Sequence, residues 1–424
     1  MQQLPRLWRH KDFRWLFLSQ SISTTGDRIV LVALALLVTE RTGSPVDLAI
    51  VLAAHAAALV AFLLIGGVWA DRLPRHRVML ATDLVRGSLH LLLAILIFTD
   101  RLEIWQLVAI EVAFGAAEAF FRPAYSGLVP QTVPEELIQE ANALNGFTQT
   151  VAEFAGPALA TGIVLTLGTG AAFAIDSGTF LLSAVLLAFV RPRPRGEPGA
   201  RSSLVAELRE GLREVRSRRW VWVTVVVFSF HLVVGFAPYV VLGPTIAEDG
   251  YGHAATFGWI AASIGLGTAT GALVALRWRP QRPLVLGILL TIPFSVLLIG
   301  FALGAPLALV LPTAVGSGVG LALFDVWWET ALAQRIPPAA LSRVASYDWM
   351  GSWALLPAGY VLIGLLGEHA DPATVMGVCG VVGALVLLLA LLPRETRALG
   401  QLAATPEPQV HSGLTPGTSG DVIR

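Results

Sequence analysis

The stretch GGVWADRLPRHRVML, residues 66–80, places one Asp, three Arg and one His between two long apolar runs. These runs cover residues 46–70 and 78–98, and each is long enough to cross a hydrocarbon core of about 30 Å as a helix. Similar runs recur from one end of the chain to the other. Because hydrocarbon offers no partner for backbone polar groups, such runs must be helical. The pattern predicts an all-α membrane protein that crosses the bilayer many times.

The composition of the 424 residues supports this class. The chain is 55% hydrophobic and 14% charged, whereas a soluble domain is typically about one quarter charged. Its formal net charge is zero, so there is no bulk field to attract nucleic acid. The single cysteine, Cys379, excludes an intramolecular disulfide and is expected to be a packing residue. The basic residues 1–15 lead into a long apolar run without a small-residue cleavage site, which indicates a cytoplasmic lead-in.

The apolar runs predict twelve transmembrane helices in two six-helix halves. Their limits are 14–39, 46–70, 78–98, 104–124, 141–166, 171–190, 220–244, 255–276, 283–303, 306–329, 343–366 and 373–393. The halves are therefore expected at residues 1–190 and 220–393, joined by a cytoplasmic linker at 191–219. Residues 394–424 are polar and rich in Pro, Gly and Thr, which predicts a disordered cytoplasmic tail.

The linker and the other basic segments predict the orientation. All of the 29 Lys and Arg residues except Arg28, Arg41 and Arg101 fall on one side, if Arg86 and Arg122 are counted at inner span ends. Basic connectors stay in the cytoplasm, so both termini are expected there. From residue 203 the linker reads as an amphipathic basic helix, either lying on the inner leaflet or acting only as a topology signal.

The two halves resemble each other in sequence. VPQTVPEELIQEANALNGF, residues 129–147, aligns with LAQRIPPAALSRVASYDWM, residues 332–350, at an offset of 203. In this register Gln131 matches Gln334 and Pro134 matches Pro337. The match places the connector after span 4 on the connector after span 10, as a six-plus-six duplication requires. Parallel halves of this kind are a transporter architecture.

Several motifs carry a resemblance to a known family. The connector between spans 2 and 3 resembles the signature of the major facilitator superfamily, and the matching residues are Gly67, Asp71, Arg72, Pro74, Arg75 and Arg77. The stretches STTGDRIVLVAL, from residue 23, and FFRPAYSGLVPQTVPEELIQEANALNG, from residue 120, are similar to the branch of bacterial siderophore exporters and macrolide or tetracycline efflux pumps.

Span 5 adds a second motif, AEFAGPALATG, which is similar to the Gly-Pro motif of drug:proton antiporters through Gly156 and Pro157. Ala152 and Ala160 stand where that motif commonly has Gly. The resemblance implies the major facilitator fold and a secondary transporter in a bacterial inner membrane. It also implies that Asp71 contacts the start of span 11, around residues 342–346, as a latch between the halves when the cavity is closed inside.

Ionisable side chains at membrane depth are costly, and they mark functional sites by default. The candidates for the proton and substrate site are Asp27, Glu111, Glu118, Asn145, Gln149, Glu153 and His231. Asp27 and Glu153 are the preferred proton carriers because each lies near mid-span on a polar face. Glu118 and Arg122 are four residues apart, so a structural ion pair is the competing interpretation. His231 competes as a packed polar residue, as does His55.

Other charged and aromatic residues fit a cavity between the halves. Asp325, Glu329 and Asp348 are expected at an inner gate or at helix ends, and Asp176 near the outer surface. Aromatic residues concentrate in spans 4, 5, 7, 10 and 11, where they can line a cavity for an amphipathic molecule or pack between helices.

The sequence therefore predicts a transporter and not an enzyme, since it contains no nucleotide-binding, hydrolase or metal-binding motif. The predicted function is export of a small amphipathic molecule, drug-like or siderophore-like, in exchange for protons. Lipid or lysolipid flipping by the same fold and a non-transporting membrane sensor are the alternatives. The expected partners are the substrate, protons and membrane lipid. No cofactor, metal or nucleic acid is expected, and the predicted state is a monomer.

Overall fold

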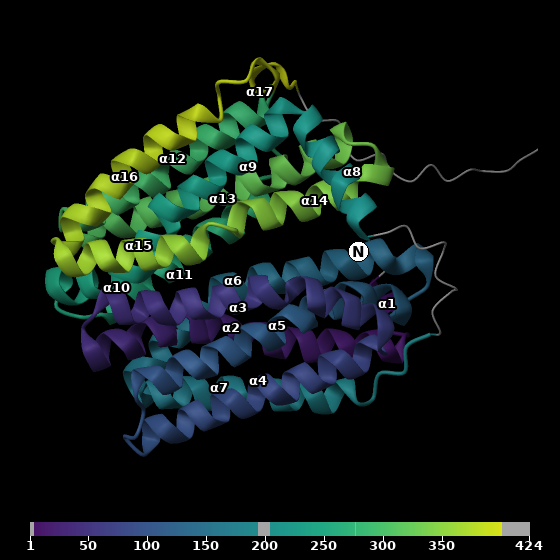
Figure 1. Cartoon of the computed structure of the whole chain (residues 1–424), viewed down its shortest axis with the longest axis horizontal. Helices are drawn as coiled ribbons and strands as arrows, with labels where there is room; N and C mark the ends of the chain where they lie inside the picture. The colour runs from purple at the N-terminus through teal and green to yellow at the C-terminus, as the bar shows by residue number, and fades with distance from the viewer. Residues whose placement is uncertain (1–3, 194–203, 276, 401–424) are drawn as a thin grey trace, which may run out of the picture.

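The computed structural model describes residues 4–193, 204–275 and 277–400 (Figure 1). The N-terminal half contains α1 (Leu4–Leu7), α2 (Lys11–Thr42), α3 (Pro45–Arg72), α4 (Arg75–Phe98), α5 (Ile104–Thr132), η1 (Glu135–Leu137), α6 (Ile138–Leu167) and α7 (Thr169–Leu187). The C-terminal part contains α8 (Leu204–Ser217), α9 (Arg219–His231), η2 (Leu232–Phe236), α10 (Ala237–Tyr251), α11 (Ala255–Ala275), α12 (Pro283–Ala302), α13 (Leu307–Arg335), α14 (Pro338–Trp353), α15 (Leu356–His369), α16 (Pro372–Leu389) and α17 (Arg394–Ala398).

Twelve helical segments in these described ranges are long and apolar enough to cross a membrane, which confirms the predicted number. The seventh, Arg219–Tyr251, joins α9 and α10 through η2, a single turn of π-helix. Large apolar side chains are exposed along the flanks of the molecule, among them Leu182 at 47% and Val296 at 51%. Lipid would cover such a surface.

The internal repeat is visible in the helix boundaries. α5 ends at Thr132 and α13 ends at Arg335, and the next helical turns begin at Glu135 and Pro338. Both pairs of boundaries keep the offset of 203 residues found in the sequence. Each break follows from a proline, Pro134 or Pro337, that directly precedes the next helical turn and cannot continue the ladder of the helix before it.

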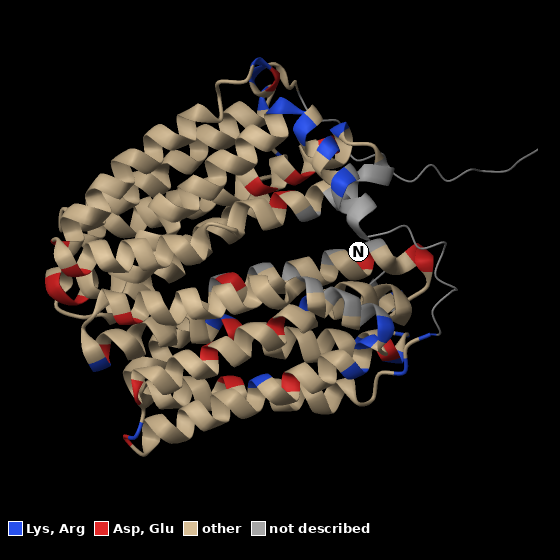
Figure 2. Cartoon of the chain, in the orientation of Figure 1, with Lys and Arg blue, Asp and Glu red and all other residues tan. Residues whose placement is uncertain are grey.

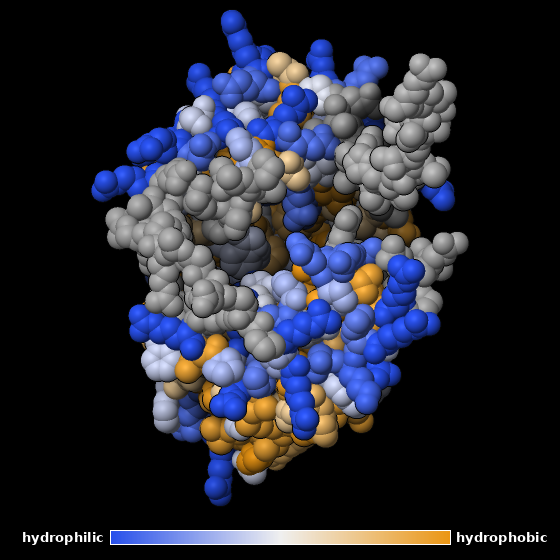
Figure 3. All heavy atoms as spheres, turned by 90° about the vertical axis from the view of Figure 1, so that its right-hand side faces the viewer, coloured by the Kyte–Doolittle hydropathy of each residue, from blue (hydrophilic) through white to orange (hydrophobic). Residues whose placement is uncertain are grey.

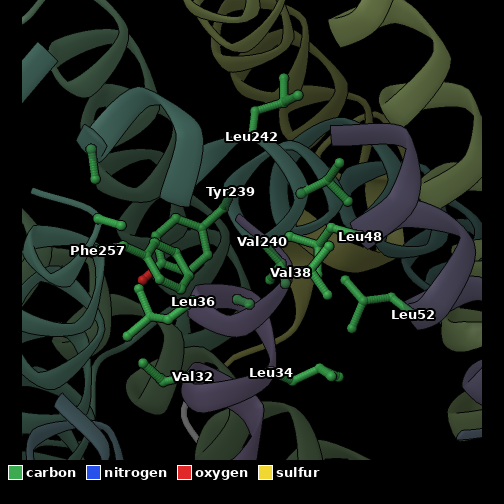
Figure 4. Close-up of a cluster of buried hydrophobic side chains, with 14 of the residues drawn as sticks. Val32, Leu34, Leu36, Val38, Leu48, Leu52, Tyr239, Val240, Leu242 and Phe257 are labelled. Carbon is green, nitrogen blue, oxygen red and sulfur yellow. The ribbon is translucent and has the colours of Figure 1, made fainter. Parts of the chain in front are cut away.

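Among the described residues, the halves pack tightly against each other at one end, which we call the closed end. It is the end where α2 finishes and α3 begins. There α3 packs on α15 and α6 packs on α11. One apolar cluster continues across the two halves at this end (Figure 4). Its members include Val32, Leu36 and Val38 of α2, Leu48 and Leu52 of α3, Tyr239, Val240 and Leu242 of α10, and Phe257 of α11.

At the opposite end, which we call the open end, apolar packing stays within each half. One cluster there draws on residues 7–190 only, and the other on residues 215–399 only. Figure 3 looks onto this end and shows a hollow between the halves. Figure 2 shows Lys and Arg gathered around the same end. The halves therefore enclose a cleft that is closed at one end and accessible from the basic end.

Two details differ from the sequence predictions. Residues 394–398, expected at the start of a disordered tail, form α17, where Glu395 accepts a hydrogen bond from the backbone N–H of Trp220 at 3.2 Å. Arg86 does not lie at an inner span end: it stands in the middle of α4 and is 2% exposed. The predicted linker helix corresponds to α8, while residues 194–203 and the tail from 401 onward lie outside the described residues.

Candidate functional site

The cleft wall of the N-terminal half carries an ion pair between two helices. Nη2 of Arg28 on α2 lies 2.5 Å from Oε1 of Glu153 on α6, and 38% of each side chain is exposed. Gly156, one turn after Glu153, makes this contact possible. A Cβ there would lie 3.1 Å from the backbone carbonyl carbon of Arg28 and 3.3 Å from its Cα, tighter than ordinary contact. The glycine of the GP motif thus lets α6 approach α2 where the pair forms.

Asp27, the neighbour of Arg28, lies near a different cation, Arg86. Its Oδ2 lies 3.8 Å from Nη1 of Arg86, and 40% of the Asp27 side chain remains exposed. Adjacent residues on a helix point about 100° apart, which explains why Arg28 and Asp27 have separate partners. Asp27 is therefore a carboxylate that the cleft can reach, attached at longer distance to a buried guanidinium.

Arg86 is held inside the N-terminal half by charge and by aromatic rings. Its Nη2 lies 2.5 Å from Oδ1 of Asp83, whose Oδ2 accepts a hydrogen bond from Ser183 at 2.6 Å. The guanidinium stands 4.2 Å from the ring centre of Phe121 and 4.3 Å from that of Phe180. Such cation–π contacts help to hold a guanidinium away from water.

Two histidines lie between carboxylates in the same half. His55 of α3 directs Nδ1 to Oε2 of Glu111 at 3.0 Å and Nε2 to Oε2 of Glu118 at 3.2 Å. His90 of α4 contacts Asp176 of α7 through Nδ1, and its Nε2 lies 3.8 Å from Oε1 of Glu111. These five side chains form an acid–base chain through four helices, from Asp176 to Glu118, with one longer separation between Glu111 and His90.

Gly115 places His55 in this chain. It lies on the Glu111–Glu118 face of α5, and a Cβ at this position would stand 3.2 Å from the carbonyl carbon of His55 and 3.3 Å from the amide nitrogen of Leu59. Only a residue without a side chain lets α3 approach so closely. The imidazole then reaches both carboxylates, which are seven residues apart on α5.

The opposite wall is acidic and aromatic. Asp325 and Glu329 of α13 are exposed, and Asp348 of α14 accepts a hydrogen bond from Nε1 of Trp328 at 2.9 Å. None of these three carboxylates forms an ion pair with a described residue. The rings of Trp349 and Trp353 stack at 5.5 Å and are 41% and 38% exposed. In Figure 2, acidic residues lie on both sides of the space between the halves.

One contact crosses the cleft. Arg122 of α5 lies over the ring of Trp349 at 4.8 Å and also binds Oε1 of Glu118, through Nη2 at 2.5 Å and Nε at 2.8 Å. The predicted Glu118–Arg122 pair therefore exists. Its guanidinium links the acid–base chain of one half to the aromatic wall of the other.

The remaining predicted polar residues do not share one site: Asn145 and His231 are buried, and Gln149 is exposed. Asn145 of α6 is 8% exposed, whereas Gln149 on the same helix is exposed. His231 of α9 is 4% exposed and is packed against the rings of Phe228 and Phe294. The described part of the chain contains no group of three or more His, Cys, Asp or Glu side chains placed to hold a metal ion.

Comparison with known proteins identifies the family. The sequence profile described as Major Facilitator Superfamily matches residues 16–352. The chain belongs to the Major Facilitator Superfamily. As a member it is a multi-pass membrane transporter rather than an enzyme, and its twelve helices in two halves are the major facilitator fold.

Relatives of this chain include proteins named as exporters, in agreement with the resemblance that its motifs carry. Macrolide efflux protein A of Streptococcus pyogenes is 25% identical over 85% of this chain and 90% of its own length. The enterobactin exporter of Shigella boydii is 27% identical over 93% of this chain and 95% of its own length. In fold, the chain is similar to a bacterial homologue of the human lysosomal transporter Spinster, solved inward-facing and unoccupied. The TM-score is 0.69 with 14% identity, over 89% of this chain and 94% of that one.

The signature connector of the superfamily lies at the open end, between α3 and α4. Arg72, Pro74 and Arg77 are exposed there, and the guanidinium of Arg75 lies against Gly127 of α5. The side chains of Gly67 and Asp71 lie outside the described residues, as do those of 341–343 and 346. The predicted latch between Asp71 and the start of span 11 therefore stays a prediction.

Some members of the charged network were not recognised in the sequence. His55 and Asp176 stand alone in their own spans, and Asp176, expected near the outer surface, is fully buried. Asp83 and His90 are not among the predicted site residues. A signal existed, because Asp83, Arg86 and His90 are spaced by three and four residues and so share one face of α4. What the sequence did not show is that this face meets the Glu111 face of α5.

Proposed function

We propose that this transporter exports amphipathic cations in exchange for protons, with its open end and both termini in the cytoplasm. The cleft carries the proposal, because it is accessible from the end where Lys and Arg gather, and basic segments stay on the cytoplasmic side. The efflux relatives support the direction of transport.

The acidic and aromatic wall supports a cationic substrate. Asp325, Glu329 and Asp348 have no described cation beside them, and Trp349 and Trp353 offer exposed ring faces. Carboxylates and aromatic faces together attract an organic cation. The described guanidinium groups that face the cleft, those of Arg28 and Arg122, are already bound to carboxylates. The wall therefore favours a cation over an anionic siderophore.

Asp27 supports proton coupling. It is the cleft-exposed carboxylate whose cation, Arg86, lies at 3.8 Å rather than at hydrogen-bond distance. A carboxylate held this loosely can take up a proton without breaking a close ion pair. Glu118, Gln149 and Glu153 complete the proposed proton and substrate site at the cleft, whereas Glu111, Asn145 and His231 are buried in this conformation.

The test is transport by purified protein in liposomes. Ethidium, a permanent amphipathic cation, and a catecholate siderophore, an anion, are supplied in turn with an imposed pH gradient. Ethidium should accumulate in the compartment that is more acidic, and the siderophore should not. Accumulation of the siderophore instead of ethidium would overturn the substrate class, and ethidium movement that ignores the gradient would overturn proton exchange.

A further inference from the structure

We infer that His55 and His90 form a proton relay inside the N-terminal half, which leads from Glu118 at the cleft to the buried Asp176. The inference rests on the proposed proton exchange and adds a route for the proton. It concerns five side chains on α3, α4, α5 and α7, none of which needs to touch the substrate.

The hydrogen-bond geometry requires additional protons on this series of histidine and carboxylate side chains. Each nitrogen of His55 faces a carboxylate oxygen, at 3.0 Å and 3.2 Å. A neutral imidazole has one N–H donor and one acceptor nitrogen, and the acceptor would repel the carboxylate that it faces. His55 must therefore be doubly protonated, or one of its carboxyl partners must carry the proton. His90, between Asp176 and Glu111, is under the same constraint.

The balance of charge leads to the same conclusion. The carboxylates of this region are Asp27, Asp83, Glu111, Glu118 and Asp176, and its described guanidinium groups are those of Arg86 and Arg122. With two neutral imidazoles, three negative charges would lack a cation inside a membrane protein. An uncompensated charge is strongly unfavourable inside a membrane protein. A second proton on each of the two imidazoles would compensate two of these three charges, so the histidine–carboxylate chain favours bound protons and can act as a proton store.

The exposed fractions of the five side chains show which end of the proton store is accessible. Exposure falls from 25% at His55 and 17% at Glu118 to 4% at Glu111, 1% at His90 and 0% at Asp176. Protons from the cleft can therefore reach the Glu118 end, whereas the Asp176 end is sealed in this conformation. Imidazole suits the task because it accepts a proton at one nitrogen while it releases one from the other.

A proton step along the chain balances. The step begins with a proton on Glu118, a neutral His55 that carries its proton on Nδ1, and an ionised Glu111. Glu118 passes its proton to Nε2 of His55 while the proton on Nδ1 moves to Glu111, so the imidazole is neutral before and after. The next step is from Glu111 to His90, across the 3.8 Å separation of Oε1 and Nε2. Both of these buried atoms lack a hydrogen-bond partner. A small side-chain rotation would close this link, and the exchange between His90 and Asp176 completes the path.

Arg122 can connect the relay to the substrate. It binds Glu118 and lies over Trp349 of the other half. When Glu118 carries a proton, it no longer balances the charge of Arg122, and this guanidinium, which already lies over Trp349, then repels a cationic substrate at the aromatic wall. Proton uptake at the relay would in this way oppose binding of a cation in the cleft.

The test separates a relay from a structural ion pair. In liposomes, His55→Gln and His90→Gln should each reduce gradient-driven ethidium accumulation at least tenfold. Ethidium exchange across the membrane without a gradient should remain, because it needs no net proton movement. His55→Lys is the decisive variant, since it keeps a cation between Glu111 and Glu118 whose ordinary pKa, about 10.4, lies far above the ordinary value of about 6.5 for histidine. It should also lose accumulation. His369→Gln, at the exposed end of α15, is the control and should keep both activities.

The outcomes are distinct. If wild-type accumulation responds to the pH gradient and His55→Lys responds equally, the histidine is a structural cation and the relay is overturned. If His55→Gln or His90→Gln loses exchange as well as accumulation, the relay is also rejected in favour of a structural role. If the wild-type protein itself ignores the gradient, proton exchange fails, and the relay fails with it. A pH dependence of ethidium affinity that persists in wild type and vanishes in the His55 variants supports the relay independently.

Discussion

Arg28 of α2 and Glu153 of α6 join the two helices that meet at the cleft wall, with 2.5 Å between Nη2 and Oε1. Glu153 is therefore not the isolated mid-membrane carboxylate that the polar face of its span suggested. Its charge is already used to balance a cation, whereas Asp27, one residue before Arg28, has its cation only at 3.8 Å. The Arg28–Glu153 ion pair therefore distinguishes Glu153 from Asp27, although the sequence predicts the same role for both carboxylates.

Replacing Glu153 should weaken ethidium transport mainly through binding. Glu153→Gln leaves Arg28 as an unpaired cation in the cleft, where it repels a cationic substrate. We expect KM for ethidium to rise roughly tenfold, the equivalent of about 1.4 kcal/mol. The double variant Arg28→Gln/Glu153→Gln removes the unpaired charge and should recover much of that loss. The initial rate of efflux as a function of ethidium concentration measures both, and an unchanged KM in Glu153→Gln would contradict the assignment.

The twelve spans could be predicted from the sequence because a membrane helix is recognised by local properties, namely the length and hydropathy of its own segment. The repeat was readable because a fixed offset needs no knowledge of packing. Arg86 was misplaced because positive charge is usual at inner span ends, and only the contact with Asp83 shows that a cation is needed at mid-span. His55 looked isolated because its partners lie on α5, 56 and 63 residues later in the chain. Which face of α3 meets α5 depends on Gly115, and that is a property of the packed structure.

Arg86 should be essential for folding stability. It is 2% exposed and pairs with Asp83, which is itself buried. Removing one partner of a buried pair leaves an uncompensated charge, so Arg86→Gln should lower the free energy of unfolding by about 3–5 kcal/mol. The double variant Asp83→Asn/Arg86→Gln should be more stable than Arg86→Gln alone. Thermal unfolding of purified protein in detergent compares them, and equal stability of the single variant and wild type would refute the buried pair.

Gly156 should be sensitive to the smallest substitution. A Cβ at this position would press on the backbone of Arg28, with its carbonyl carbon at 3.1 Å, so Gly156→Ala must separate α6 from α2. We expect a loss of about 1–3 kcal/mol in stability and reduced transport as the Arg28–Glu153 contact lengthens. Gly162→Ala, on the same helix, is the matched control because a Cβ there meets nothing within 4 Å. If both variants behave alike, close packing at Gly156 is not the reason for its glycine.

The proton link can be tested most directly at Asp27. Asp27→Asn keeps the size of the side chain and removes its ability to carry a proton as a carboxylate. Ethidium movement is measured in liposomes under two conditions, with an imposed pH gradient and with ethidium gradients alone. Our account predicts that Asp27→Asn abolishes accumulation driven by the pH gradient and retains downhill ethidium exchange. Full gradient-driven accumulation in Asp27→Asn would contradict it.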